Sequence, residues 1–450
     1  MLLAHRIRID ATPDQRAYFA RAAGTARRVW NWALAEWQRQ VDAGGKPNAM
    51  ALKKQFNRIK YADPAWLDEN GLPWIRTIHR DAHSQPFAHL ARAWTRYFEA
   101  RRTGQAAHLP RFKKKGRCTD SFYIANDKFR IEGKQAVLPK IGRVGLAEKL
   151  RWTGRIMGAA VSCNAGHWFL AVQVEVPDEV AYRRRTSNGV VGVDLGITSV
   201  ATLSTGEKIA APRPLRAALR RLRILGRRLS RKLEAAKASA GIADAIPTKA
   251  RWPVSKNRTK GSLALARLHA RIAQVRQDFT HKLTTRLCRE NQAVAIEDLN
   301  VRGMLANARL SRAIADVGFY EIRRQLLYKA ARYGTLLVLA DRWYPSSKLC
   351  AGCGARNGAL ALGERTWDCG PCGTHHDRDV NAALNLQRLA TSALVARSAL
   401  PVASQAATPG TAAGDVPAGD GEVTPVRHEL GQQDGSGQEE NAARFRARFC

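Results

Sequence analysis

Two Cys-x-x-Cys pairs near the C-terminal end of this 450-residue chain constrain its structure more than any other feature. Fifteen residues separate the pairs, which are Cys350 with Cys353 and Cys369 with Cys372. Four thiolates at this spacing complete a tetrahedral zinc site and leave no open position, so the predicted zinc is structural. His375 and His376 are alternative ligands, although flanking positions are the simpler interpretation. The pattern predicts a zinc ribbon over residues 346–373.

Two acidic residues follow the last cysteine at a distance that a structural zinc site does not require. Asp377 and Asp379 bracket Arg378 at the expected start of a helix, and either carboxylate could cap that helix. Residues two apart at a helix start point in different directions, so we expect only one of them to be a metal ligand. We select Asp379, which directly precedes the helical pattern.

Two further acids end apolar segments that are typical of buried strands. Asp194 follows residues 190–193 and precedes Leu195-Gly196, while Glu297 follows residues 293–296. Alone, Asp194 is equally compatible with a turn or with the phosphate-binding strand of an actin-like ATPase, and Glu297 with a helix cap or surface acid. Together with Asp379, they could hold two Mg²⁺ ions about 4 Å apart and support phosphodiester hydrolysis.

The charge of the chain indicates a polyanionic partner. There are 74 Lys plus Arg against 38 Asp plus Glu, a net charge of +36 that is spread over most of the sequence. Each basic run alone is compatible with a solvated surface, but together they predict nucleic-acid contacts. The candidates are Arg111, Lys113, Lys114, Lys115, Arg220 and Arg227.

The distribution of apolar residues gives no reason to expect a membrane partner. No apolar run approaches the roughly 20 residues that a membrane span needs, and the first residues lack the apolar stretch of a signal peptide. The cysteines outside the two pairs form no disulfide framework, so we expect reduced thiols and a cytoplasmic location.

The sequence pattern divides the chain into four structured parts and a tail. Residues 1–10 and 106–185 predict a small antiparallel β-barrel or sheet, interrupted by a helical module over 11–105. Residues 189–345 and 374–391 alternate strands with helices and predict an α/β domain into which the zinc ribbon is inserted. Residues 392–450 are expected to be largely disordered.

More local expectations concern the α/β region. Residues 212–236 predict a strongly basic helix, and 237–260 predict a polar loop. Residues 313–333 predict one helix, which leads into a strand over 335–341. Arg183 to Asn188 are expected to form a linker before the first strand of this region.

The ordered set of motifs resembles the TnpB (OrfB) family, whose members are encoded by bacterial insertion sequences and are related to compact type V CRISPR effectors. The resemblance covers about residues 1–390, and it rests on Gly192–Gly196, Ile296–Val301, Asp341–Lys348, the two cysteine pairs and Asp377–Ala383. It implies a multidomain α+β protein. A RuvC-type, ribonuclease-H-like α/β nuclease domain with a zinc-ribbon insertion would accompany an N-terminal β-barrel (wedge) with a helical recognition insertion.

The same resemblance implies an RNA-guided, Mg²⁺-dependent DNA endonuclease. Asp194, Glu297 and Asp379 match the acidic triad of the RuvC domain, and the four cysteines match its structural Zn²⁺ site. A guide RNA from the transposon end would pair with double-stranded target DNA beside a short adjacent motif. The protein would act as a monomer with its RNA, associated with the bacterial nucleoid.

Three alternatives remain open at this point. A miniature type V CRISPR effector would have the same chemistry and a neighbouring CRISPR array instead of transposon ends. A binding-only regulator of transposition or transcription would retain its activity when Asp194 is replaced. An actin-like ATPase would require a second phosphate-binding glycine-rich turn in the C-terminal half, which we do not find.

Overall fold

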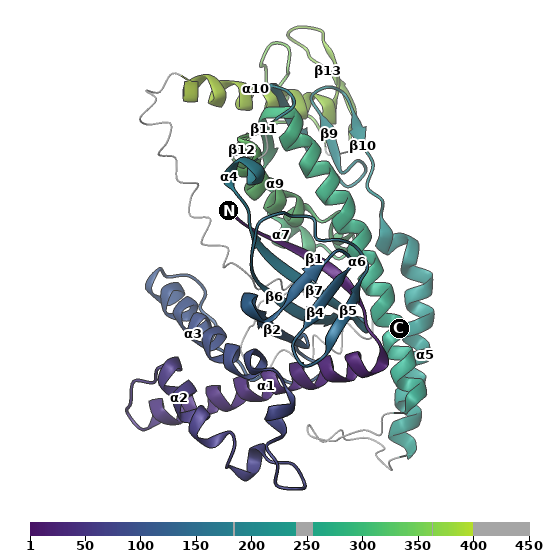
Figure 1. Cartoon of the computed structure of the whole chain (residues 1–450). Helices are drawn as coiled ribbons and strands as arrows, with labels where there is room; N and C mark the ends of the chain where they lie inside the picture. Colours follow the sequence, from purple (N-terminus) through teal and green to yellow (C-terminus); the bar gives the residue numbers. More distant parts are fainter. Residues whose placement is uncertain (183–184, 240–254, 362, 399–450) are drawn as a thin grey trace. The chain divides into compact units, whose positions relative to one another are not determined.

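The structure, a computed structural model, describes residues 1–182, 185–239, 255–361 and 363–398 (Figure 1). The described chain forms two compact units, of which the first is Met1–Asp178 and the second begins at Glu179. Each unit contains its own β-sheet, and the second also contains a short two-stranded hairpin. No described helix is both long and apolar enough to cross a membrane.

The first unit is built on a seven-stranded antiparallel sheet of strand order β2-β6-β7-β1-β5-β4-β3. Its N-terminal strand β1 pairs with β7 on one side and with β5 on the other, with Ile7 opposite Leu170. The strands are β1 Leu2–Asp10, β2 Ser121–Ala125, β3 Arg130–Glu132, β4 Gln135–Leu138, β5 Gly142–Leu146, β6 Arg155–Asn164 and β7 His167–Glu175.

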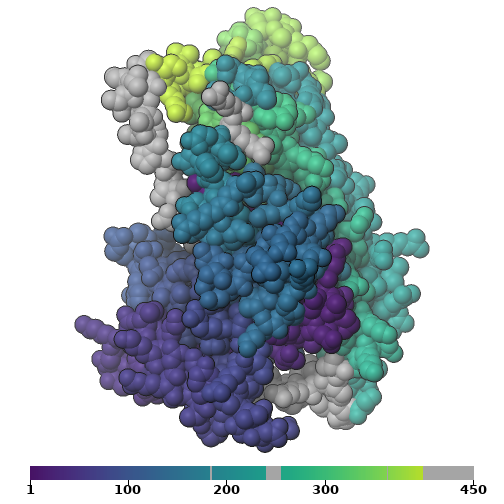
Figure 2. All heavy atoms as spheres, in the orientation of Figure 1, coloured from purple at the N-terminus to yellow at the C-terminus, as the bar shows by residue number. Residues whose placement is uncertain are grey.

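This sheet is open, which corrects the expectation of a β-barrel for residues 1–10 and 106–185. Closure would require the edge strands β2 and β3 to pair with each other, and no such pairing occurs among the described residues. β3 is only three residues long, so it offers little backbone for closing the sheet. In the space-filling view, the side chains of the blue strands form a continuous surface on the visible face (Figure 2).

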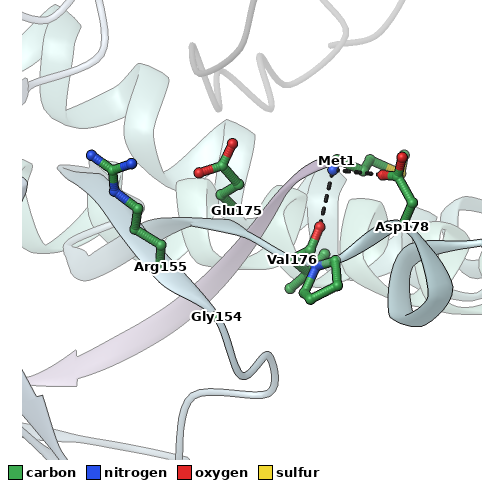
Figure 3. A pocket seen from close by; sticks show the side chains of 7 residues that line it. Met1, Gly154, Arg155, Glu175, Val176 and Asp178 are labelled. Atoms are coloured by element: carbon green, nitrogen blue, oxygen red, sulfur yellow. Dashed lines mark hydrogen bonds and ion pairs between the residues drawn. The ribbon is translucent and has the colours of Figure 1, made fainter.

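The amino terminus is anchored at the end of β7. The Met1 ammonium donates to the Val176 carbonyl at 3.0 Å and pairs with the Asp178 carboxylate at 3.0 Å (Figure 3). These contacts line a shallow surface pocket, and they hold β1 in register beside β7.

Three helices follow β1 and precede β2 in the first unit: α1 Pro13–Asp42, α2 Ala49–Ile59 and α3 Arg80–Arg102. α1 begins with a capping box, because the Thr12 side chain accepts from the Gln15 amide while the Gln15 side chain accepts from the Thr12 amide. Aromatic residues fill the space between the helices, and Trp37 stacks on Trp94 at 5.1 Å. These tryptophans therefore belong to a core.

The second unit has a five-stranded sheet of order β10-β9-β8-β11-β12, in which β8, β11 and β12 are parallel. Helices cover both faces, as parallel sheets require. Val193 and Ile296 face α6 and α9, whereas Ala293 and Ala295 face α10. The strands are β8 Gly189–Asp194, β9 Ala201–Leu203, β10 Lys208–Ile209, β11 Asn291–Glu297 and β12 Leu336–Ala340, with the hairpin β13 Thr366–Asp368 and β14 His375–Asp377.

The helices of the second unit differ from the expectations in three places. They are α4 Asp178–Ala181, α5 Pro214–Ser239, α6 Lys256–Glu290, α7 Val301–Ala306, α8 Ser311–Val317, α9 Phe319–Tyr333 and α10 Arg378–Ser398. α6 starts inside the expected polar loop because Ser255 caps it, accepting from the Arg258 amide at 3.1 Å. The expected single helix over 313–333 is divided at Gly318, whose φ of +78° ends α8.

The third difference lies at the C-terminal end. The expected disorder of 392–450 is wrong for residues 392–398, which continue α10 to Ser398. Residues 183–184 of the expected linker, 240–254 of the expected loop and 399–450 of the expected tail lie outside the described residues.

Candidate metal sites of the second unit

Two neighbouring parallel strands end in acidic residues at the same edge of the second sheet. β8 ends at Asp194 and β11 ends at Glu297, and Val193 lies opposite Ile296 in the register of the pair. The preceding residues are buried and apolar, so the strands are held in the core while their carboxyl ends reach the surface. Both carboxylates are half-buried and lie at the sheet edge where open α/β sheets bind ligands.

Helix α10 brings the third acid to this edge. The helix lies on β8 and β11, and the Gln387 side chain donates to the Val190 carbonyl at 2.7 Å. A Cβ at Gly192 would lie 1.9 Å from the Ala383 carbonyl oxygen, so only glycine permits this close packing. Because Asp379 lies in the first turn of α10, the helix carries it toward the strand ends.

Electrostatic coupling shows that the three acids lie near one another. Burial raises the pKa of Asp194 well above its ordinary value, and the neighbouring carboxylates of Glu297 and Asp379 raise it further. Arg378 and Arg365 act in the opposite direction, and Arg365 Nη1 lies 3.7 Å from Asp379 Oδ1. Three carboxyl groups therefore lie near one another at one edge of the sheet.

The adjacent acids have other partners. Asp377 Oδ1 accepts from the backbone amides of Asp379 at 3.1 Å and Val380 at 3.0 Å, which makes Asp377 the N-cap of α10. Its Oδ2 accepts from Lys208 at 2.6 Å. Asp298 pairs with Arg323 and, at 3.1 Å, with Arg342. Asp377 therefore serves as a helix cap, and Asp298 serves as an ion-pair partner of two arginines.

Ser346 was not among the residues selected from the sequence, and it contacts one of the three acids directly. Its hydroxyl donates to Glu297 Oε1 at 2.7 Å, and its side chain is buried. The segment that carries it, Asp341–Lys348, was recognised as a motif, but nothing in its spacing indicates which residue turns toward Glu297. Arg365 was likewise missed, because it directly precedes β13 and approaches Asp379 only in the folded chain.

The four cysteines form a compact cluster. Their sulfur atoms all lie within 4.8 Å of one another, with Cys350 to Cys372 and Cys353 to Cys369 each at 3.6 Å. A tetrahedral zinc with Zn–S bonds of about 2.3 Å would place its sulfur ligands about 3.8 Å apart, so the thiols fit the ion. Hydrogen bonds with Thr374 lower the pKa of the Cys372 thiol to about 6, whereas burial and hydrogen bonds with the other thiols raise the pKa of Cys369 to about 12. Zinc binding would require the thiolate at every position.

Hydrogen bonds connect the cysteine cluster to α10. Asn381 accepts from the Ala351 amide at 2.8 Å and donates to the Leu349 carbonyl at 2.7 Å. Asn385 donates to the Ser346 and Leu349 carbonyls. His376 Nε2 lies 3.0 Å from the Cys350 sulfur, which places this imidazole beside the cluster and one residue before the N-cap of α10. The cluster therefore helps to position the helix that carries Asp379.

The predicted nucleic-acid residues are divided between the units. Arg220 and Arg227 are exposed on α5 of the second unit. Lys114 and Lys115 are exposed in the segment before β2 of the first unit, whereas the Lys113 ammonium lies 4.2 Å from the Trp30 ring. The backbone of this segment is held to α1, because Trp30 donates to the Arg111 carbonyl at 2.9 Å.

Comparisons with known families agree with this arrangement. Residues 171–308 match the OrfB_IS605 family, described as "Probable transposase", and residues 319–386 match the "Cas12f1-like, TNB domain". Residues 1–46 match a "Helix-turn-helix domain" of the same OrfB_IS605 group. The matches to the second unit together span the strands, the cysteine cluster and the first turns of α10.

Curated relatives and a solved structure cover most of the chain. A "Putative RNA-guided DNA endonuclease" of Streptomyces pristinaespiralis is 36% identical over 85% of this chain and 88% of its own length. The Escherichia coli K12 protein InsQ, which carries the same description, is 29% identical over 86% of this chain and 91% of its own length.

The fold resembles that of Cas12f1 in a cryo-EM complex with single-guide RNA and target DNA, with a TM-score of 0.50, 15% identity and coverage of 84% of this chain and 83% of that one. The sequence relationship extends over both units, and the structural likeness is consistent with it. The chain therefore belongs to the OrfB (TnpB) family encoded by insertion sequences.

Proposed function

We propose that this chain is an RNA-guided DNA endonuclease that hydrolyses phosphodiester bonds at Asp194, Glu297 and Asp379. The observation that carries the proposal is the convergence of these acids from β8, β11 and α10, which lie far apart in the sequence. The net charge of +36 accounts for attraction of the polyanionic substrate. The curated relatives are described as endonucleases of this kind.

The donor set suits Mg²⁺, which prefers hard oxygen ligands. The carboxylates of Glu297 and Asp379 help to raise the pKa of Asp194, and a divalent cation would relieve this repulsion. Three carboxylates from separate elements could together hold two such ions.

When bound, Mg²⁺ would supply an activated water and charge stabilisation for the leaving oxygen. The protein's own residues would hold and orient the site. Ser346 fixes the carboxylate of Glu297, and Asp377 fixes the first turn of α10 so that Asp379 faces the strand ends. Arg365 and Arg378 would offset negative charge when a phosphate approaches.

The four cysteines would hold one structural Zn²⁺. Through Asn381 and Asn385, this ion would stabilise the position of α10 relative to the segment that carries Ser346. The zinc would take no part in the chemistry, because four thiolates leave it no open position.

The partners of the proposed enzyme are a guide RNA from the transposon end and double-stranded target DNA beside a short adjacent motif. Base pairing would read the target sequence, while the protein would contact backbones through residues such as Lys114, Lys115, Arg220 and Arg227. The protein would act as a monomer with its RNA, associated with the bacterial nucleoid.

A miniature type V CRISPR effector is the second candidate, favoured by the match to the Cas12f1-like domain over 319–386. It would use the same acids and the same zinc site. The origin of the bound RNA separates the two: RNA from the transposon end supports the first candidate, and RNA from a CRISPR array supports the second.

The test is to purify the full chain co-expressed with its flanking DNA, sequence the bound RNA, and add matched duplex DNA with Mg²⁺. Wild type is expected to cut the DNA only with its RNA, and Asp194→Asn is expected to bind RNA without cutting. Equal cleavage by Asp194→Asn would reject the site. RNA binding without cleavage by either protein would instead support a binding-only regulator.

A further inference from the structure

Trp343 is the most exposed large apolar side chain of the described residues, with 86% of its surface accessible. Burial of such a side chain would ordinarily stabilise a fold, so its exposure needs a reason. The tryptophan lies in the connection that leaves β12 and leads to the cysteine cluster.

The backbone around Trp343 is held in place on both sides. The Trp343 amide donates to Asp341 Oδ1 at 2.8 Å, and the Tyr344 amide donates to the Asp341 carbonyl at 3.0 Å. The Tyr344 side chain packs against the core beneath α10, and Arg342 pairs with Asp298 at 3.1 Å. The turn therefore presents the indole to solvent from a fixed position.

The same turn lies beside the proposed nuclease site. Ala340, at the end of β12, is in register with Glu297, and Ser346 donates to the Glu297 carboxylate at 2.7 Å. Trp343 is three residues from each of these anchors, so its Cα lies within about 11 Å of both. This reach corresponds to about three nucleotides at the ~3.4 Å rise of one stacked strand.

Two arginines lie near the turn that carries Trp343. Arg342 and Arg323 both pair with Asp298, the residue after Glu297, and their side chains are 48% and 37% exposed. Two partly exposed guanidinium groups therefore lie at Asp298, close in the chain to the turn. An exposed aromatic face with guanidinium groups in the same region suits a nucleotide, whose base can stack while its phosphate pairs with a cation.

We infer that Trp343 is the stacking platform for one base of a single DNA strand that enters the proposed nuclease site. The inference rests on the proposed function and deepens it, because it names the residue that holds the strand near the cut. A base inside a duplex is stacked on its neighbours, so the indole can receive only an unpaired one. The position of Trp343 near Glu297 would keep that strand next to the three acids.

The experiment measures binding and contact separately from cleavage. The full chain carrying Asp194→Asn is purified with its RNA and mixed with a short single-stranded DNA in which 5-iodouracil replaces one thymine at successive positions. Affinity is measured at raised salt, because screening weakens backbone contacts elsewhere on the basic surface. After irradiation, trypsin releases residues 343–348, which end at Lys348, and mass spectrometry identifies the cross-linked peptide.

Two substitutions and one control are compared in the same background. Trp343→Ala is expected to weaken binding about 5- to 150-fold, the equivalent of the ~1–3 kcal/mol of one base–aromatic stack. Trp343→Phe keeps an aromatic face and is expected to retain most of the affinity. Tyr182→Ala is the control, because it removes another exposed aromatic side chain, with 50% of its surface accessible. Tyr182 follows Ala181, whose carbonyl accepts from Arg332 in the last turn of α9. No change in DNA affinity is expected.

A cross-link on the 343–348 peptide together with weaker binding by Trp343→Ala supports the inference. Unchanged affinity in Trp343→Ala, with cross-links elsewhere, overturns it and leaves a protein partner as the occupant of the exposed indole. The two proposals fail separately. If Trp343→Ala cleaves guided DNA with unchanged KM and kcat, only the stacking role is rejected. If Trp343 cross-links to DNA but the wild-type protein never cuts, only the endonuclease is rejected.

Discussion

Gly192 of β8 lies directly beneath the Ala383 carbonyl of α10, so close that a Cβ at residue 192 would be 1.9 Å from that oxygen. It would also lie 2.3 Å from the Gln387 amide nitrogen. The helix can therefore rest on the sheet only where β8 has no side chain. Asp194 lies two residues after Gly192 in β8. The contact therefore fixes the position of α10, and with it Asp379, relative to the strand that ends at Asp194.

Replacement of Gly192 by alanine is expected to displace α10 and to destabilise the protein by about 1–3 kcal/mol, the usual cost of overpacking a core. Cleavage is expected to fall because Asp379 moves with the helix. Urea unfolding and guided cleavage measure the two effects. Gly226→Ala is the matched control, since no heavy atom lies within 4 Å of its Cβ and an alanine inside α5 should add helix stability.

Asp377 and Asp379 are expected to respond differently to the same substitution. Asp379→Asn removes a proposed metal ligand and should lower cleavage by about 10²-fold or more, the loss that several kcal/mol of transition-state stabilisation produces. Asp377→Asn keeps an oxygen that can cap α10 and loses mainly the ion pair with Lys208, which is worth about 0–1 kcal/mol at the surface. Single-turnover rates at saturating Mg²⁺ compare them, and equal losses would contradict the assignment.

Ser346→Ala removes the hydroxyl that orients the Glu297 carboxylate at 2.7 Å. Partners that orient metal ligands usually contribute 10- to 100-fold to metal affinity or activity, so the Mg²⁺ concentration for half-maximal cleavage is expected to rise by about that factor. A titration with Mg²⁺ measures it. Ser347→Ala changes the neighbouring serine and should leave the midpoint unaltered; a shift as large as that of Ser346→Ala would argue against the contact.

Removal of zinc is expected to affect cleavage through α10. Chelation should release one Zn²⁺ per chain and free the segment that Asn381 and Asn385 hold, so that Asp379 loses its fixed position. Tm should fall by at least about 2–4 °C, the shift that ~1 kcal/mol produces in a domain of roughly 150–250 residues. Added Zn²⁺ should restore Tm and cleavage together, whereas Mg²⁺ alone should restore neither.

A buried lysine makes the stability of the second unit depend on pH. Lys329 donates to Thr284 at 2.7 Å and to the His281 carbonyl at 2.8 Å, and burial lowers its pKa to about 8. The unfolded chain keeps the ordinary lysine pKa, so between about pH 8 and 10.4 it binds more protons than the folded protein. The charged lysine therefore costs stability below pH 8, and this cost is relieved as pH rises through that window.

The difference in unfolding free energy between wild type and Lys329→Met isolates this effect from other titrating groups. It should change in favour of wild type by up to about 1.4 kcal/mol per pH unit between pH 8 and 10. Urea unfolding at several pH values measures it. A difference that is flat across this range would show that Lys329 titrates normally in the folded protein.

Local patterns predicted most elements of the second unit. The apolar segments before Asp194 and Glu297 became β8 and β11, because runs of buried β-branched residues flanked by turns are typical of strands. The basic helix expected over 212–236 corresponds to α5, Pro214–Ser239. The break at Gly318 was missed, because an isolated glycine inside a helical pattern does not show whether its φ will become positive.

Longer-range features of the first unit were harder to anticipate. The strands were expected from their alternation, but the choice between a barrel and an open sheet depends on whether β2 and β3 meet. That pairing joins residues which are close in sequence yet lie on opposite edges of the sheet. Alternation reports which face of a strand is buried, and it contains no information about closure.

The sequence by itself determined the elements whose information is local: the spacing of the four cysteines, the apolar strands that end in acids and the positive charge. Only the tertiary structure decided which acids lie near Asp194 and which bind other partners. Asp377 caps α10 and Asp298 pairs with arginines, while Asp379 and Glu297 lie near Asp194. The physical reason is that a carboxylate's role depends on the neighbours that packing brings to it. Those neighbours can be distant in the chain, as Lys208 is 169 residues from Asp377.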